Sequence, residues 1–192
     1  LLFYYYFLFF LPNFQLSDEE TNLLTDFLMA QKSYPDNASL DSLPLLLTTA
    51  TDEQKSNLEE IGSTRFREAR CISCHRINGK GGSVASDLGK VTSKVSKQWL
   101  YNYLKNPKHL QPNVEMPRYR FSENDLMGVI TYMESEFVDF EFTEIPASTP
   151  DPAYYEKGMA LFKKYNCSGC HELSGMNEAE EMGPELSSVG SK

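Results

Sequence analysis

The sequence has no cysteine outside two short motifs, and this absence leaves no thiols for a disulfide framework. Positive charge is also scarce, because 18 Lys and Arg face 27 Asp and Glu, giving a net charge of −9. Such an acidic chain repels phosphate, which argues against a nucleic-acid partner and suits either basic partners or simple solubility. With 41% hydrophobic and 23% charged residues, the composition is that of an ordered protein.

Long apolar runs are absent as well. The run LLFYYYFLFFL at residues 1–11 falls well short of the ~20 residues needed to cross a bilayer. It also lacks the charged start and the small-residue cleavage site of a signal peptide. We interpret it as the stub of a membrane helix or as a buried segment, and no functional prediction depends on it.

Two segments of the chain are repeated. EIGSTRFREARCISCH at 60–75 aligns with EKGMALFKKYNCSGCH at 156–171. MPRYRFSENDLMGVITYM at 116–133 aligns with LPNFQLSDEETNLLTDFL at 11–28. Internal repetition indicates repeated structural units. The order of the copies predicts the tail of one unit, then a whole unit, then the head of a third.

This repetition divides the chain into five expected regions. They are the tail of a preceding unit at 1–32, a linker at 33–51, a complete domain at 52–142, a Pro-rich linker at 143–152, and the N-terminal half of a second domain at 153–192. Three prolines close together make the second linker a semi-rigid spacer.

Helical periodicity dominates the rest of the pattern. Ser122 with Asp125, and Ser17 with Glu20, have the spacing of capping boxes that open helices. Apolar residues follow the first of these pairs at helical spacing, namely Leu126, Val129, Ile130 and Met133. Because no stretch shows sustained period-2 alternation, we predict an all-α fold.

Two C-x-x-C-H motifs carry the chemistry. They comprise Cys71, Cys74 and His75, and Cys167, Cys170 and His171. Two cysteines at this spacing reach the two vinyl groups of one haem, and the next histidine is placed to ligate the iron. We therefore predict two covalently bound haem c groups. The alternative is one zinc site built from all four thiolates, which leaves both histidines unexplained.

These residues give the chain a family resemblance. Residues 55–140 resemble a class I cytochrome c domain, and 153–192 resemble the first half of another. The resemblance rests on the C-x-x-C-H motif, the MPRY loop and the helix residues Gly62, Phe66 and Tyr132. It implies tandem all-α domains, in which the first and last helices cross at Gly62 and Tyr132. It also implies that Met116 is the sixth ligand of the first haem iron.

The resemblance is incomplete in two places. In the family, a Gly-Pro-x-Leu loop offers its proline carbonyl to the ligand histidine and so fixes the ring. Pro184 matches this proline, whereas Ser86 stands there in the first domain. Leu11 stands where the counterpart of Met116 is expected and cannot ligate iron.

The sequence assigns the two sixth ligands differently. For the first haem we expect Met116, with His109 or an open position as alternatives. For the second, Met176 and Met182 follow His171 too closely to repeat the long loop that carries Met116. We therefore expect that the sequence is a fragment of a longer chain, that a partner subunit covers this haem, or that the haem is open and reactive.

The function implied by the resemblance is electron transfer between redox partner proteins through covalent haems. We expect no enzymatic activity, and we expect a place within a membrane-associated respiratory complex, with other subunits as neighbours. The alternatives are a di-haem peroxidase with an open haem site, and a structural subunit whose haems connect a larger complex. The resemblance also implies a periplasmic or other extracytoplasmic location, because haem is generally attached to C-x-x-C-H there.

Overall fold

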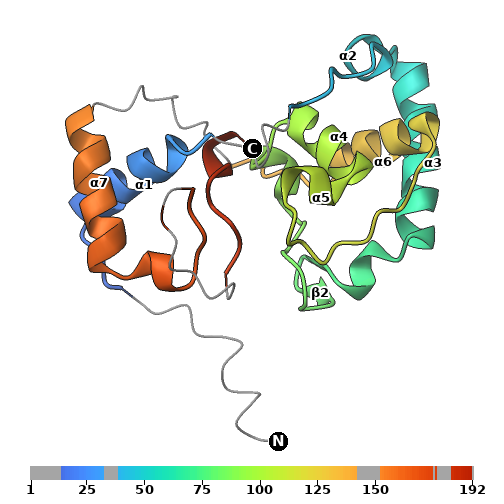
Figure 1. Cartoon of the computed structure of the whole chain (residues 1–192). Coiled ribbons are helices and arrows are strands. Elements are labelled where there is room, and N and C mark those ends of the chain that lie inside the picture. The colour runs from blue at the N-terminus through green and yellow to red at the C-terminus, as the bar shows by residue number, and fades with distance from the viewer. Residues whose placement is uncertain (1–13, 33–38, 142–151, 175, 177–182, 192) are drawn as a thin grey trace, which may run out of the picture. The chain divides into compact units, whose positions relative to one another are not determined.

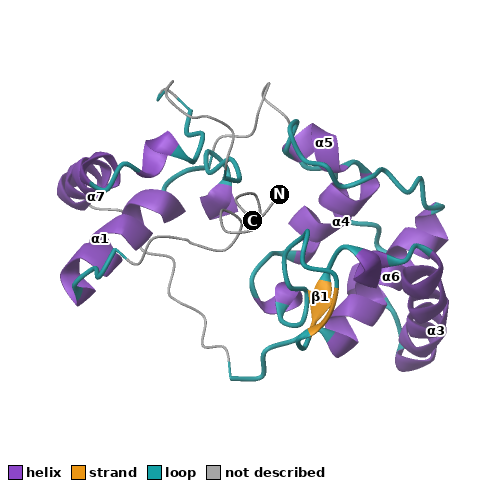
Figure 2. Ribbon diagram, turned by 90° about the horizontal axis from the view of Figure 1, so that it is seen from below, coloured by secondary structure: helices purple, strands orange, loops and turns teal. Residues whose placement is uncertain are grey.

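The computed structural model describes residues 14–32, 39–141, 152–174, 176 and 183–191, and this part of the chain is mostly helical (Figures 1 and 2). Its helices are α1 (Asp18–Met29), α2 (Leu46–Thr49), α3 (Asp52–Glu68), α4 (Lys97–Lys105), α5 (Pro107–Leu110), α6 (Glu123–Glu136) and α7 (Pro152–Lys164). The predicted helical character is confirmed. No helix among the described residues combines the length and apolarity that a bilayer crossing needs.

A small β-hairpin departs from the all-α prediction. Strands β1 (Arg76–Ile77) and β2 (Lys80–Gly81) pair antiparallel. Asn78 and Gly79 join them with φ angles of 49° and 79°. Two positive φ angles are typical of a type I′ turn, for which Asn-Gly is the preferred pair. That dipeptide therefore signals the turn, although the strands are too short to show alternation.

The described residues form two compact units. The central unit contains residues 39–141, and the terminal unit combines 14–32 with the described residues from 152 to 190. The sequence predicts that 1–32 and 153–192 belong to different units, but the described residues of both ranges form one compact unit, because α1 packs against α7. The order of the sequence had separated two segments that share one core.

The central unit is built on the crossing of α3 and α6. A Cβ atom on Gly62 of α3 would clash with the carbonyl oxygen of Gly128 and lie 2.8 Å from the Cβ of Tyr132. The close approach predicted for Gly62 and Tyr132 is thus confirmed. The two helices bury their apolar faces together with α4, in a cluster that includes Leu58, Phe66, Leu100, Leu104, Leu126, Val129, Ile130 and Met133. Each such side chain contributes about 1.5–3 kcal/mol when fully buried.

Part of the predicted 33–51 linker belongs to the central unit. Leu47 of α2 is 7% exposed and lies in the same apolar cluster. The amide of Asn102 on α4 binds the backbone of Asp41 twice, with its Oδ1 accepting from the N–H at 2.8 Å and its Nδ2 donating to the carbonyl at 3.0 Å. Residues 33–38, and all of the 143–152 linker except Pro152, lie outside the described residues.

The terminal unit has a smaller core. Ser17 and Glu20 form the predicted capping box at the start of α1. Phe27 of α1 and Phe162 of α7 are 0% and 1% exposed, and their ring centroids lie 5.5 Å apart. Leu24 and Leu173 complete the buried cluster. In Figure 1, α1 (blue) and α7 (orange) lie against each other although they come from opposite ends of the sequence.

Candidate haem-binding site

The first C-x-x-C-H motif follows directly from the end of α3. Arg70 takes a left-handed conformation, with φ 54°, which ends the helix and turns the chain. A 3₁₀ turn at Cys71–Ser73 follows, and the N–H of Cys74 donates to the carbonyl of Cys71 at 3.2 Å. Residues i and i+3 lie one above the other in a 3₁₀ turn. The two thiols are therefore carried on one side of the turn, as attachment to a single macrocycle requires.

The next residue, His75, is held by the backbone of a following loop. Its Nδ1 lies 2.8 Å from the carbonyl oxygen of Ser86. Since a carbonyl only accepts, Nδ1 carries the proton and donates it. Nε2 then presents a lone pair, the arrangement typical of a metal-ligating histidine. The N–H of Ala85 donates to the Cys74 carbonyl at 3.0 Å, so the loop is fixed to the motif at a second point.

The two thiols of this motif have different surroundings. Cys71 is half-buried and packs against the central cluster, whereas Cys74 is exposed. Burial raises the pKa of the Cys71 thiol to about 11. Its sulfur therefore remains a neutral thiol at physiological pH.

The loop that carries Met116 lies next to the motif. Met116 is half-buried and packs against the same apolar cluster as Cys71. Burial raises the pKa of Tyr119, and the nearby thiols of Cys71 and Cys74 raise it further. The segment that follows Met116 therefore lies close to both cysteines. The alternative ligand, His109, is exposed on α5.

The second motif repeats the geometry of the first. Asn166 ends α7 with φ 53°, and a 3₁₀ turn follows at Cys167–Gly169. His171 Nδ1 lies 2.9 Å from the Pro184 carbonyl oxygen, as the resemblance implied. Ser86 supplies the equivalent carbonyl in the central unit, so the serine preserves this contact.

No loop equivalent to the one that carries Met116 is seen among the described residues of the second site. Met176 is half-buried in the core of the terminal unit, and its N–H donates to the Leu173 carbonyl at 2.9 Å. Met176 therefore packs into the core as part of the loop that joins His171 to Pro184. Met182 and Leu11 lie outside the described residues.

The donor set of each motif fits a haem c group. Each has two unpaired thiols and an imidazole that is held through Nδ1. When bound, the haem supplies an iron that cycles between two oxidation states. The cysteines would attach the macrocycle, and the backbone carbonyls would orient the imidazoles. In the described part of the chain, no group of three or more His, Cys, Asp or Glu side chains is arranged to hold a bare metal ion.

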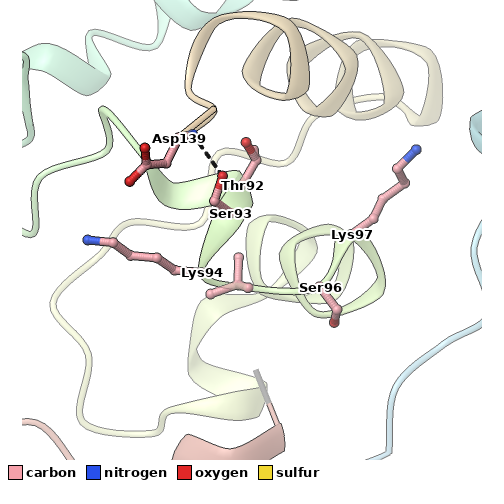
Figure 3. Close-up of a pocket in the computed structure, with 7 residues that line it drawn as sticks. Thr92, Ser93, Lys94, Ser96, Lys97 and Asp139 are labelled. Carbon is pink, nitrogen blue, oxygen red and sulfur yellow. Dashed lines mark hydrogen bonds between the residues drawn. The ribbon is translucent and has the colours of Figure 1, made fainter. Parts of the chain in front are cut away.

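A separate surface hollow lies beside the end of α6 (Figure 3). It is lined by Thr92, Ser93, Lys94, Val95, Ser96, Lys97 and Asp139. Much of its polar lining is bonded within the unit. The N–H of Asp139 donates to Ser93 Oγ at 2.8 Å, and the Thr92 hydroxyl donates to the Phe137 carbonyl at 2.7 Å. The hollow lies where residues 92–97 pack against the end of α6, and no predicted haem residue lines it.

Comparison with known proteins agrees with this geometry. A helical unit that presents two thiols and a held imidazole beside a methionine loop is the arrangement that a haem c domain needs. Residues 59–136 match the Cytochrome c family model, so this part of the chain is a cytochrome c domain. Domains of this family bind haem c and transfer electrons. The match lies within the central unit, and neither the curated proteins nor the solved structures gave a match.

Proposed function

We propose that this protein is an electron carrier with two haem c groups, one in each unit. Cys71 and Cys74 attach the first haem, and His75 and Met116 ligate its iron. Three further residues serve the second haem, namely Cys167 and Cys170 for attachment and His171 as a ligand. The two haems pass electrons between a donor and an acceptor protein.

One observation carries this proposal. Both histidines are held through Nδ1 by a backbone carbonyl, at 2.8 Å for His75 and 2.9 Å for His171. Such a bond sets the tautomer and the ring direction before the iron binds and increases the basicity of the ligand. Two unrelated zinc half-sites have no need for the same bond at the same place. The repetition therefore supports one haem at each motif.

Haem counting tests the proposal directly. Protein matured with haem should keep all its colour after acid-acetone treatment, and its intact mass should exceed that of the polypeptide by two haems. Replacing Cys71 and Cys74 with alanine should remove one of these haems, and replacing Cys167 and Cys170 should remove the other. Loss of the haem to the solvent, or a single haem in the unaltered chain, would refute the two-haem assignment.

Redox and peroxide assays on the same haem-loaded protein distinguish an electron carrier from a peroxidase. A carrier should be reduced and reoxidised by small redox proteins, and it should not turn over hydrogen peroxide with a reduced donor. Steady-state peroxide consumption above that of free haem would favour the enzyme instead.

We further propose an extracytoplasmic location and association with a respiratory complex. Cell fractionation, followed by native electrophoresis of the solubilised membranes, tests both.

A further inference from the structure

The crossing of α1 and α7 repeats the crossing of α3 and α6. A Cβ atom on Gly158 of α7 would clash with the carbonyl of Leu23 and lie 2.5 Å from the Cβ of Phe27. In the sequence repeat, Leu23 corresponds to Gly128 and Phe27 to Tyr132. Gly128 and Tyr132 are the residues that Gly62 approaches in the central unit. One glycine in each unit thus allows the same close contact between the same pair of positions.

The aromatic packing at the two crossings also agrees. Phe162 of α7 packs on Phe27 of α1 with ring centroids 5.5 Å apart. Phe66 of α3 packs on Tyr132 of α6 with ring centroids 5.6 Å apart. In both units, the helix that leads into the C-x-x-C-H motif is therefore covered by a ring from the other helix.

Backbone conformation gives an independent match. Asn166 and Arg70, which precede the two motifs, have φ angles of 53° and 54°. Gln15 and Arg120, which precede α1 and α6, have φ angles of 46° and 53°. Left-handed non-glycine residues are uncommon, so their recurrence at two equivalent places is not a property of helices in general.

The backbone hydrogen bonds around the second motif also match those around the first. The N–H of Gly183 donates to the Cys170 carbonyl at 2.7 Å, as the N–H of Ala85 does to Cys74. Beyond this loop, the N–H of Gly190 donates to the carbonyl of Gln31, just past α1, at 2.9 Å. In the central unit, Thr92 donates to Phe137, just past α6, at 3.2 Å. The loop after the motif is thus tied to the end of the closing helix in each unit.

We infer that α1 is the closing helix of the second haem site, so that segments from both ends of the sequence build one haem-binding domain. The domain is permuted, because its last helix precedes its haem-attachment motif in the chain. This inference rests on the proposed function for the haem at Cys167 and Cys170. The pairing of α1 with α7 can nevertheless be tested whether or not that haem is present.

Zero-length cross-linking tests the pairing in the unaltered chain. Lys164 Nζ of α7 lies 3.0 Å from Glu20 Oε1 of α1. A carbodiimide should therefore join the two residues by an amide bond, which mass spectrometry of the digested monomer detects. The control pair, Lys90 and Asp139, lies 2.8 Å apart within the central unit. Cross-linking of the control alone, or a Glu20–Lys164 link found only in dimers, would overturn the inference.

A matched pair of variants tests whether α1 supports the second haem. Phe27→Ala removes the buried ring from α1, which is remote in sequence from the second motif. It should lower the folded-to-unfolded ratio of the terminal unit by more than about a hundredfold. The change is read from the Soret band in a chain whose only haem is the second one, because Cys71 and Cys74 are replaced. Tyr132→Ala should instead affect the haem at Cys71 and Cys74 in the complementary single-haem chain.

The control on the same helix is Asn22→Ala, because Asn22 is exposed. It should leave both haems unchanged. If Phe27→Ala alters the second haem no more than Asn22→Ala does, the inference is wrong. If Phe27→Ala prevents folding altogether, the cross-link in the unaltered chain still decides the pairing. A chain with the cross-link but without a second haem would refute the haem assignment and leave the helix pairing intact.

Discussion

His75 Nδ1 lies 2.8 Å from the carbonyl oxygen of Ser86, and this bond orients the imidazole before any iron is present. The carbonyl belongs to a loop that is held tightly against the motif. Within that loop, the N–H of Gly82 donates to the carbonyl of Ile72 at 2.9 Å. The ligand direction is therefore set by backbone contacts, so it tolerates the change from proline to serine. It should not tolerate a shift of the loop.

Gly82→Ala should move this loop. A Cβ atom on Gly82 would clash with the carbonyl oxygen of Ser73 and lie 2.8 Å from the carbonyl carbon of Cys74. The loop must then withdraw and carry the Ser86 carbonyl away from His75. We expect loss of the first haem or a fall in its reduction potential, with no change at the second. Redox titration of both haems measures this, and Ser83→Ala on the same loop should behave as the wild type.

Met116→His should lower the potential of the first haem. A thioether stabilises ferrous iron, whereas a second imidazole favours ferric iron, and axial ligands set haem potentials over about 0.8 V. The thioether-to-iron charge-transfer band at the red end of the spectrum should disappear. Met127→Leu is the control, because Met127 is 8% exposed and lies in the helical core. An unchanged band and potential in Met116→His would show that another residue ligates the iron.

Much of the central site follows from the sequence, because its signals are local. The spacing of Cys71, Cys74 and His75 within one turn defines the attachment chemistry. Gly62 is recognisable because its partner, Tyr132, lies at the expected place in a periodic helix. The contact of Ser86 with His75 is less visible, since it involves a backbone carbonyl that any residue provides.

The pairing of the two ends was not predictable from the order of the segments. Both segments were recognised as parts of the repeat. Their sequence order nevertheless places α1 before any motif and suggests a separate preceding unit. Only packing in space, through Phe27 and Phe162, brings them into one core. A pattern on one segment reveals its apolar face but does not name the segment that covers it.

Asn102 supports the fold through contacts that no sequence pattern predicts, and Asn102→Ala should destabilise the central unit. Asn102 is 5% exposed, and its amide holds the Asp41 backbone while also donating to the Gln98 carbonyl at 2.9 Å. Removing these bonds leaves partly buried groups unpaired, at a cost of about 1–3 kcal/mol. Urea unfolding measures the change. Lys105→Ala removes an exposed ion pair to Asp41 and an ammonium group 5.4 Å from the Tyr101 ring centroid, and it should cost less, about 1 kcal/mol.

The half-buried phenol of Tyr103 predicts a loss of stability at high pH. Tyr103 stacks on Trp99 with ring centroids 4.5 Å apart, and burial raises its pKa to about 12. An unfolded tyrosine has a pKa near 10, so the folded state holds this proton more tightly. The resulting stabilisation is complete below about pH 10 and is lost as the pH rises towards 12. At 1.36 kcal/mol per pH unit, the loss should reach up to about 3 kcal/mol.

The single tryptophan, Trp99, stacks on Tyr103, and its fluorescence therefore reports the unfolding of this region. Urea midpoints followed in this way should fall between pH 10 and pH 12 in the wild type. They should fall much less in Tyr103→Phe, which has no phenol proton to lose. Tyr154→Phe removes an exposed hydroxyl, on a side chain that is 48% exposed, and should keep the wild-type pH dependence. Equal pH slopes in the wild type and Tyr103→Phe would show that a different group controls the alkaline transition.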